Sequence, residues 1–243
     1  MNKLFNKILL TSVILVASLW WVNQAEAAMA FVSAESNVST TVALTHSFGF
    51  NVGTGSNRLL VCGVSHYNGE DKKVESATFD SVSMTRANYE GGAALVFVET
   101  WYLVNPNSGD KTLAMTYEGP SSMSQSVIGC IEYTGAAQTN IVDATSSLSA
   151  NDSNPSSTVT TATASTTVVS VFNGRNNLSS ANKTERYLDN TTATKGAGQD
   201  EIKGVAGATT HSYTMTSQNF SVIITSFKEF VATTSRRRVI TIQ

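Results

Sequence analysis

The segment from Ala94 to Pro106 constrains the fold more than any other part of this chain. Its apolar residues occupy both alternation faces, with Leu95, Phe97, Trp101 and Leu103 on one face and Val96, Val98, Tyr102 and Val104 on the other. This pattern is typical of a strand at the centre of a packed sheet. The β-branched and aromatic content favours a strand over a helix, and the turn residues that begin at Asn105-Pro106 end it.

Shorter segments with strand character surround this one. They are residues 31–34, 41–48, 58–66, 74–79, 82–87, 111–117, 126–134, 141–144, 158–163, 167–172, 185–188, 209–214 and 220–230. Residues 146–157 are polar and we expect a long exposed loop there, whereas 173–207 should hold little beyond its one short strand. No convincing helical period follows the first thirty residues. The pattern predicts an all-β, two-sheet antiparallel β-sandwich with jelly-roll-like topology.

The first 27 residues have the character of a secretory signal peptide. Lys3 and Lys7 supply positive charge, residues 8–22 are apolar, and Ala25-Glu26-Ala27 is a small-x-small cleavage site. Cleavage after Ala27 is expected, with a cut after Ala30 as the alternative. An uncleaved anchor is the competing interpretation, but the apolar run is shorter than the roughly 20 residues of a spanning helix. We therefore expect a secreted protein with no stable membrane span after removal of the leader.

The composition is consistent with an extracellular β protein. Only 14% of the residues are charged, and Ser, Thr, Asn, Gly and Ala take the place of Lys and Glu. The net charge of −2 does not supply the broad basic surface that a nucleic-acid partner needs. We therefore expect no nucleic-acid partner.

Residues 231–243 form a separate tail after the predicted domain at 28–230. Arg236, Arg237 and Arg238 precede a short β-prone segment formed by Val239, Ile240, Thr241 and Ile242. Two interpretations are open. The segment folds back onto its own sheet or frays, or it is a detached strand donated to the sheet edge of another subunit. In the second case the arginines could pair with carboxylates on the neighbour or with anionic polymers at a cell surface.

Several short sequence motifs resemble segments of known proteins. They are residues 57–61, the Trp-Tyr-Leu-Val-Asn-Pro sequence at 101–106, and residues 133–138, 142–144 and 226–228. Together they resemble a recurrent group of bacterial, metagenomic and phage-associated β-sandwich proteins of unassigned function. The resemblance covers residues 42 to 230 approximately. It implies a jelly-roll-like sandwich of the kind found in exported or particle-associated proteins. It indicates no catalytic residues in this chain.

Cys62 and Cys130 each lie inside a strongly apolar predicted strand. An exported chain with an even number of cysteines can form a disulfide, and closing so long a loop would contribute about 4 kcal/mol. The alternative is a pair of buried thiols that pack as small hydrophobic groups.

Glu99 and Glu132 interrupt apolar strands and are the carboxylates of greatest interest. Either could share a surface with Trp101 or Phe97, so these four residues are a candidate glycan-binding surface. Catalysis by the two carboxylates is a weaker alternative. The three histidines lack the spacing of a zinc site, and the acidic residues lack that of a calcium loop. We expect no metal and no cofactor.

The leading hypothesis is an exported, non-enzymatic structural or adhesive protein. It would assemble with copies of itself into a surface filament or coat by strand donation. The alternative is a carbohydrate-binding, lectin-like module that recognises a cell-surface glycan. A glycoside hydrolase comes third.

Overall fold

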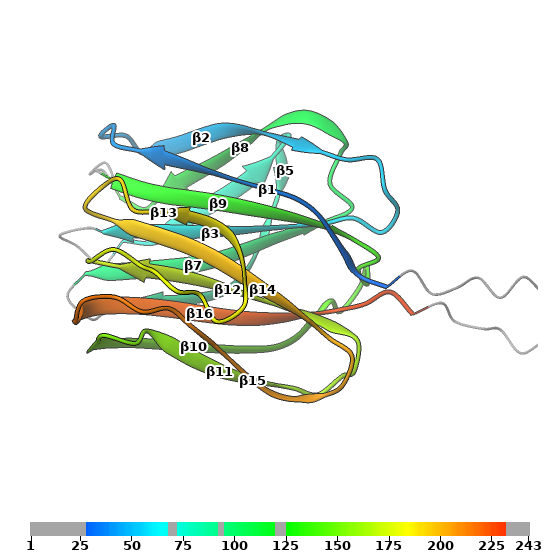
Figure 1. Ribbon diagram of the computed structural model, residues 1–243. Helices are drawn as coiled ribbons and strands as arrows, with labels where there is room; N and C mark the ends of the chain where they lie inside the picture. The colour runs from blue at the N-terminus through cyan, green and yellow to red at the C-terminus, as the bar shows by residue number, and fades with distance from the viewer. Residues whose placement is uncertain (1–27, 68–71, 92–94, 120–124, 232–243) are drawn as a thin grey trace, which may run out of the picture. The chain divides into compact units, whose positions relative to one another are not determined.

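The structure is a computed structural model that describes residues 28–67, 72–91, 95–119 and 125–231. Within these residues the chain forms sixteen β-strands and no helix (Figure 1). The all-β class predicted from the sequence is therefore confirmed. The predicted leader and the tail beyond Val231, including the arginine triplet and the segment 239–242, lie outside the described residues.

The strands form four antiparallel sheets, which we name by their position in the chain. The N-terminal inner sheet has the order β1 (Ala30–Ser39), β9 (Gln125–Thr134), β3 (Leu59–Tyr67), β7 (Val96–Val104), β6 (Thr85–Gly91). The N-terminal outer sheet has the order β2 (Thr45–Val52), β8 (Gly109–Tyr117), β4 (Val74–Phe79), β5 (Val82–Ser83). The C-terminal inner sheet has the order β10 (Val142–Asp152), β16 (Gln218–Lys228), β12 (Thr166–Gly174), β14 (Lys195–Lys203), β13 (Thr184–Asp189). The C-terminal outer sheet pairs β11 (Ser156–Thr161) with β15 (Gly207–Ser212).

The hydrophobic clusters show how the sheets pack. One cluster joins the N-terminal outer and inner sheets, with Phe50 and Leu113 of the first against Leu60 and Trp101 of the second. A second joins the two inner sheets, and a third joins the C-terminal inner sheet to its outer sheet. Each inner sheet is therefore covered on both faces. The antiparallel sandwich packing predicted from the sequence is confirmed, and the strands are divided among four sheets rather than two.

This arrangement explains why the segment around β7 is apolar on both alternation faces. The side chain of Trp101 packs in the cluster with the outer sheet, whereas Val98 packs against Val171 and Ile223 of the other inner sheet. The whole of β12 is likewise buried. A central strand in such a stack has no solvent-facing side, so it cannot show the alternation of polar and apolar residues typical of a two-layer sandwich.

The inner sheets approach each other closely around Tyr187. Gly63 and Gly129 are directly opposite each other on β3 and β9, and Tyr187 of β13 lies over both. A Cβ atom at Gly129 would be 2.2 Å from Cζ of Tyr187, and one at Gly63 would be 2.5 Å from its hydroxyl oxygen. Glycine is required at this pair because any side chain would push the two sheets apart.

Two predictions about the second half of the chain are wrong. Residues 146–157, expected as a loop, contain most of the edge strand β10 and the first residues of β11. Residues 173–207 contain β14, a largely buried strand between β12 and β13, in addition to the strand expected near 185–188.

Cys62 and Cys130 form a disulfide, as one of the two interpretations of the sequence predicted. The residues are directly opposite each other on the neighbouring strands β3 and β9, with Cα atoms 4.1 Å apart. Both are fully buried in the cluster beneath the N-terminal outer sheet. The crosslink therefore joins strands that are adjacent in the sheet but 68 residues apart in the chain.

In the part of the chain that the structure describes, no helix has the length and apolar character needed to cross a membrane.

Candidate functional site

The Glu99 carboxylate lies between the N-terminal inner and outer sheets and is completely buried. Its Oε1 accepts a hydrogen bond from the backbone N–H of Val74 on β4 at 2.6 Å. Its Oε2 accepts hydrogen bonds from Nε1 of Trp101 at 3.0 Å and from Nη1 of Arg86 at 3.4 Å. Nε2 of His66 lies 3.7 Å from Oε1. The carboxylate therefore ties a strand of one sheet to two strands of the other.

The four residues predicted to form a glycan-binding surface are buried. Phe97, Glu99, Trp101 and Glu132 are 1%, 0%, 6% and 0% exposed. Phe97 stacks on the His66 ring at 5.2 Å between centroids, and the guanidinium of Arg86 lies over the Trp101 ring at 5.4 Å. As expected, Glu99 and Trp101 share a face of β7, but the outer sheet covers that face. None of the four side chains can stack against or bind a sugar from solvent, so this prediction is wrong.

Glu132 has a similar structural role at another point of the same interface. Both carboxylate oxygens lie 3.1 Å from the backbone nitrogen of Gly53, which directly follows β2. Oε2 also accepts a hydrogen bond from the Ser33 hydroxyl on β1 at 3.3 Å. The carboxylate thus fixes the end of β2 against the edge of the inner sheet.

The two glutamates are also too far apart to act as a pair. Glu99 is opposite Val64 of β3, and Glu132 is opposite Leu60 of the same strand. They are therefore two strands and four residues apart, which corresponds to roughly 16 Å in a regular sheet. Paired glycosidase carboxylates are about 5 to 9.5 Å apart. This geometry does not support joint catalysis by these two residues.

A serine–histidine contact lies between the same two sheets. Nδ1 of His46 is 2.5 Å from the Ser126 hydroxyl, and its Nε2 is 3.0 Å from the carbonyl oxygen of Thr41. Burial lowers the pKa of His46, partly opposed by the hydrogen bond to Thr41, so the ring is neutral at pH 7. Ser126 is 0% and His46 4% exposed. A substrate has no access to this pair, and its polar groups connect β2 with β9.

An ion pair within the C-terminal inner sheet also contacts the N-terminal inner sheet. Nε of Arg186 on β13 lies 2.8 Å from Oδ1 of Asp200 on β14, and the hydroxyl of Tyr133 on β9 donates to Oδ2 at 2.7 Å. Burial and the Asp200 carboxylate raise the pKa of Tyr133, which keeps its hydroxyl protonated as a donor. The Arg186 guanidinium also lies over the Phe31 ring of β1, 3.7 Å from its centroid. These groups hold the sheets together.

His211 lies between β15 and the C-terminal inner sheet. Its Nδ1 is 2.8 Å from the Ser170 hydroxyl, and its Nε2 is 3.8 Å from Oε2 of Glu201. Burial lowers the pKa of His211 to about 4, although the Glu201 carboxylate opposes that effect. The imidazole is therefore neutral in the folded protein at pH 7.

We predict that this histidine makes the protein sensitive to mild acid. In the unfolded chain a histidine binds a proton near pH 6.5, whereas folded His211 does so only near pH 4. Stability should therefore fall as the pH decreases from about 6.5 to about 4, by about 3 kcal/mol from this group alone. Urea unfolding at several pH values in this window would measure the loss.

A His211→Gln variant isolates this contribution from other titrating groups. It should be less stable at neutral pH, and it should lose less stability than the parent protein between pH 6.5 and pH 4.5. An identical pH dependence in the two proteins would show that His211 does not drive the acid sensitivity.

Among the described residues, no group of three or more histidine, cysteine, aspartate or glutamate side chains is arranged to hold a metal ion. His46, His66 and His211 belong to the structural contacts described above.

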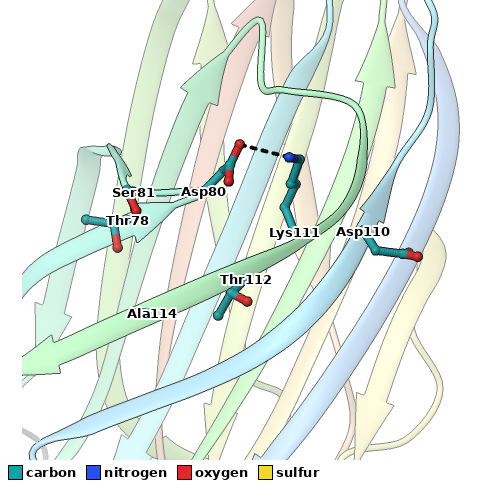
Figure 2. A pocket seen from close by; sticks show the side chains of 7 residues that line it. All are labelled: Thr78, Asp80, Ser81, Asp110, Lys111, Thr112 and Ala114. Carbon is teal, nitrogen blue, oxygen red and sulfur yellow. Dashed lines mark ion pairs between the residues drawn. The ribbon is translucent and has the colours of Figure 1, made fainter.

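The surface of the described residues includes the following two hollows. One, of about 350 Å³, lies on the outward face of the N-terminal outer sheet and is lined by Thr78, Asp80, Ser81, Asp110, Lys111, Thr112 and Ala114 (Figure 2). The other, of about 440 Å³, is lined by residues 137–140, 163–165 and 228–231, where the described chain ends. Neither was predicted from the sequence, because each depends on which turns lie side by side.

Comparisons with protein-family models, with curated proteins and with solved structures find no match to this chain.

Proposed function

We propose that this protein is an exported, non-enzymatic structural protein that assembles with copies of itself through its C-terminal segment. The observation that carries the proposal is how the chain leaves the sandwich. After β16, the backbone N–H of Phe230 donates to the Gly135 carbonyl at 2.7 Å, and Val231 is 63% exposed. Val231, the last described residue, is therefore exposed beside the 440 Å³ hollow, and the arginine triplet and the β-prone segment follow it in the sequence.

The remaining length is sufficient to reach a neighbour. Val239 comes eight positions after Val231, and an extended chain rises about 3.3 Å per residue, so these eight steps span roughly 26 Å. A strand formed by Val239–Ile242 could therefore pair with another molecule while Val231 remains attached to its own sandwich.

Sheet edges that could accept such a strand are present in the described structure. β1 and β6 are the edges of one inner sheet, and β10 and β13 are the edges of the other. Phe31 and Val32 of β1 are 36% and 41% exposed, and Leu148 of β10 is 43% exposed. Unpaired edges with exposed apolar residues are the usual acceptors in strand addition, because main-chain hydrogen bonds supply the affinity.

We predict that assembly requires the segment 232–243. The parent protein should form filaments, arrays or oligomers in negative-stain electron microscopy and sedimentation. A version that ends at Val231 should be a folded monomer. Ile240→Pro and Thr241→Pro each remove one backbone donor, on opposite edges of an extended strand, so at least one should weaken assembly at least tenfold.

Thr233→Pro is the matched control, since it lies in the segment before the arginines and should assemble normally. Replacing Arg236, Arg237 and Arg238 together with Gln separates charge pairing from strand pairing. Assembly that persists in the version ending at Val231 would refute the proposal, as would a monomeric parent protein at all concentrations tested.

The alternative proposal, carbohydrate binding, is favoured by a different observation, which is the polar hollow on the N-terminal outer sheet.

A further inference from the structure

We propose that the hollow over β4 and β8, on the outward face of the N-terminal outer sheet, binds a neutral sugar ring through its hydroxyl groups. This inference rests on the alternative proposal of carbohydrate binding and names its site and ligand class. It does not depend on the assembly proposal, because the hollow is built entirely from described residues of the N-terminal outer sheet.

The floor of the hollow is made of short side chains. Thr78 of β4 and Ala114 of β8 are directly opposite each other, and Thr112 is the next outward residue of β8. On the other side of β8, Gly49 of β2 is opposite Thr112, and no atom lies within 4 Å of the position that a Cβ would occupy there. A ligand can therefore approach the sheet closely, with the Ala114 methyl available to the C–H face of a sugar ring.

The wall on one side is held in a fixed conformation. Asp80 and Ser81 form the turn between β4 and β5, with φ values of 51° and 65°, both in the left-handed region. Such a pair is typical of a tight two-residue hairpin turn. The backbone N–H of Asp80 donates to the Thr112 carbonyl at 3.0 Å, which attaches the turn to β8.

The Asp80 carboxylate is oriented by two partners. Nδ2 of Asn107 donates to Oδ2 at 2.8 Å, and Nζ of Lys111 lies 3.2 Å from the same oxygen (Figure 2). Both contacts are to Oδ2, so Oδ1 can accept a hydrogen bond from a ligand. The hydrogen bonds to Asn107 and Lys111 lower the pKa of Asp80, which keeps it an acceptor in mild acid. A preoriented acceptor reduces the entropy lost on binding.

The remaining polar groups of the lining can form hydrogen bonds with adjacent hydroxyl groups of a sugar ring. The hydroxyls of Thr78, Ser81 and Thr112 can each donate and accept, whereas the exposed Asp110 carboxylate lies at the rim and points away from them (Figure 2). Sugar hydroxyls also donate and accept, so a ring can satisfy both kinds of group at once. Two carboxylates and one ammonium give the lining a net charge of −1, which disfavours uronic and sialic acids. The chemistry therefore selects a neutral ring.

The test is saturation-transfer NMR on the purified protein with glucose, galactose, mannose and N-acetylglucosamine, and with glucuronic acid as the charged comparison. The hollow is shallow and open, so a dissociation constant of about 1 mM is expected. At least one neutral sugar should receive saturation, and glucuronic acid should receive little or none.

Two variants locate the binding. Ala114→Gln fills the floor and should abolish saturation transfer, and Asp80→Asn, which replaces the oriented carboxylate but suits the same turn, should weaken binding at least fivefold. The matched control is Ala208→Gln, which changes an exposed alanine opposite Thr160 on the C-terminal outer sheet and should bind normally. A version ending at Val231 should also bind normally, which separates this inference from assembly. Absence of transfer to every neutral sugar, or full transfer in Ala114→Gln, would overturn the proposal.

Discussion

Replacing Cys62 and Cys130 together with alanine is expected to lower the free energy of unfolding by about 4 kcal/mol. The disulfide closes a loop of 68 residues, and chain entropy predicts a stabilisation of this size because the crosslink restricts the unfolded chain. The bonded residues are already opposite each other in register on β3 and β9, so the native sheet can form without the bond. We therefore expect a folded but less stable protein.

Urea unfolding under non-reducing conditions measures this effect. The wild-type protein, unfolded and refolded in the presence of a reductant, is the matched control, because it keeps both sulfur atoms without the crosslink. It should unfold at nearly the same urea concentration as the double variant. If the reduced wild type is as stable as the oxidised protein, the crosslink does not stabilise the fold.

The strands that were predicted best from the sequence are those with continuous runs of apolar residues. β3, β7 and β9 lie in the N-terminal inner sheet, and each was recognised from its apolar run. The apolar residues on both faces of β7 already indicate that the strand is covered on both sides. The prediction of a two-sheet sandwich did not take this into account. A strand covered on both sides requires at least three layers, and the structure has outer sheets against both inner sheets.

β14 was missed, and β10 was predicted only at its start, because their inward positions are occupied by small or polar residues. β14 has Gly196 and Gly198 on the side that approaches the other inner sheet, where Cβ atoms would collide with Val127 and Tyr187. Its buried Asp200 is stabilised by an ion pair rather than by hydrophobicity. β10 is a serine-rich edge strand that packs Ala144 and Ala150 inward. Neither strand has an apolar alternation that sequence reasoning can detect.

The site predictions failed for a different reason. The sequence placed Glu99 and Trp101 on one face of β7 correctly, and the hydrogen bond between them agrees with that. Whether the face is open depends on the outer sheet, whose strands β2, β4 and β8 come from both sides of β7 in the chain. The hollow lined by Asp80 and Lys111 needs the register of β4 with β8. Such long-range pairings are not encoded in local spacing.

Replacing Arg186 with methionine is expected to destabilise the protein by 3 to 5 kcal/mol, a typical range when one partner of a buried ion pair is removed. Asp200 is 2% exposed, and without Arg186 its carboxylate would keep only the Tyr133 hydroxyl as a described side-chain donor. Methionine preserves the apolar contact with the Phe31 ring, so the loss reports mainly on the unpaired charge. Urea unfolding at pH 7 measures it.

The double variant Arg186→Met with Asp200→Asn tests that cause. An amide oxygen can still accept the Tyr133 hydrogen bond, and no charge is buried, so at least half of the lost stability should return. Lys183→Met is the control for an ordinary ion pair. Lys183 and Glu201 are 3.0 Å apart, with side chains 24% and 29% exposed, so the cost should be about 1 kcal/mol or less. A double variant as unstable as Arg186→Met would mean that the packing of Arg186, and not its charge, joins the two inner sheets.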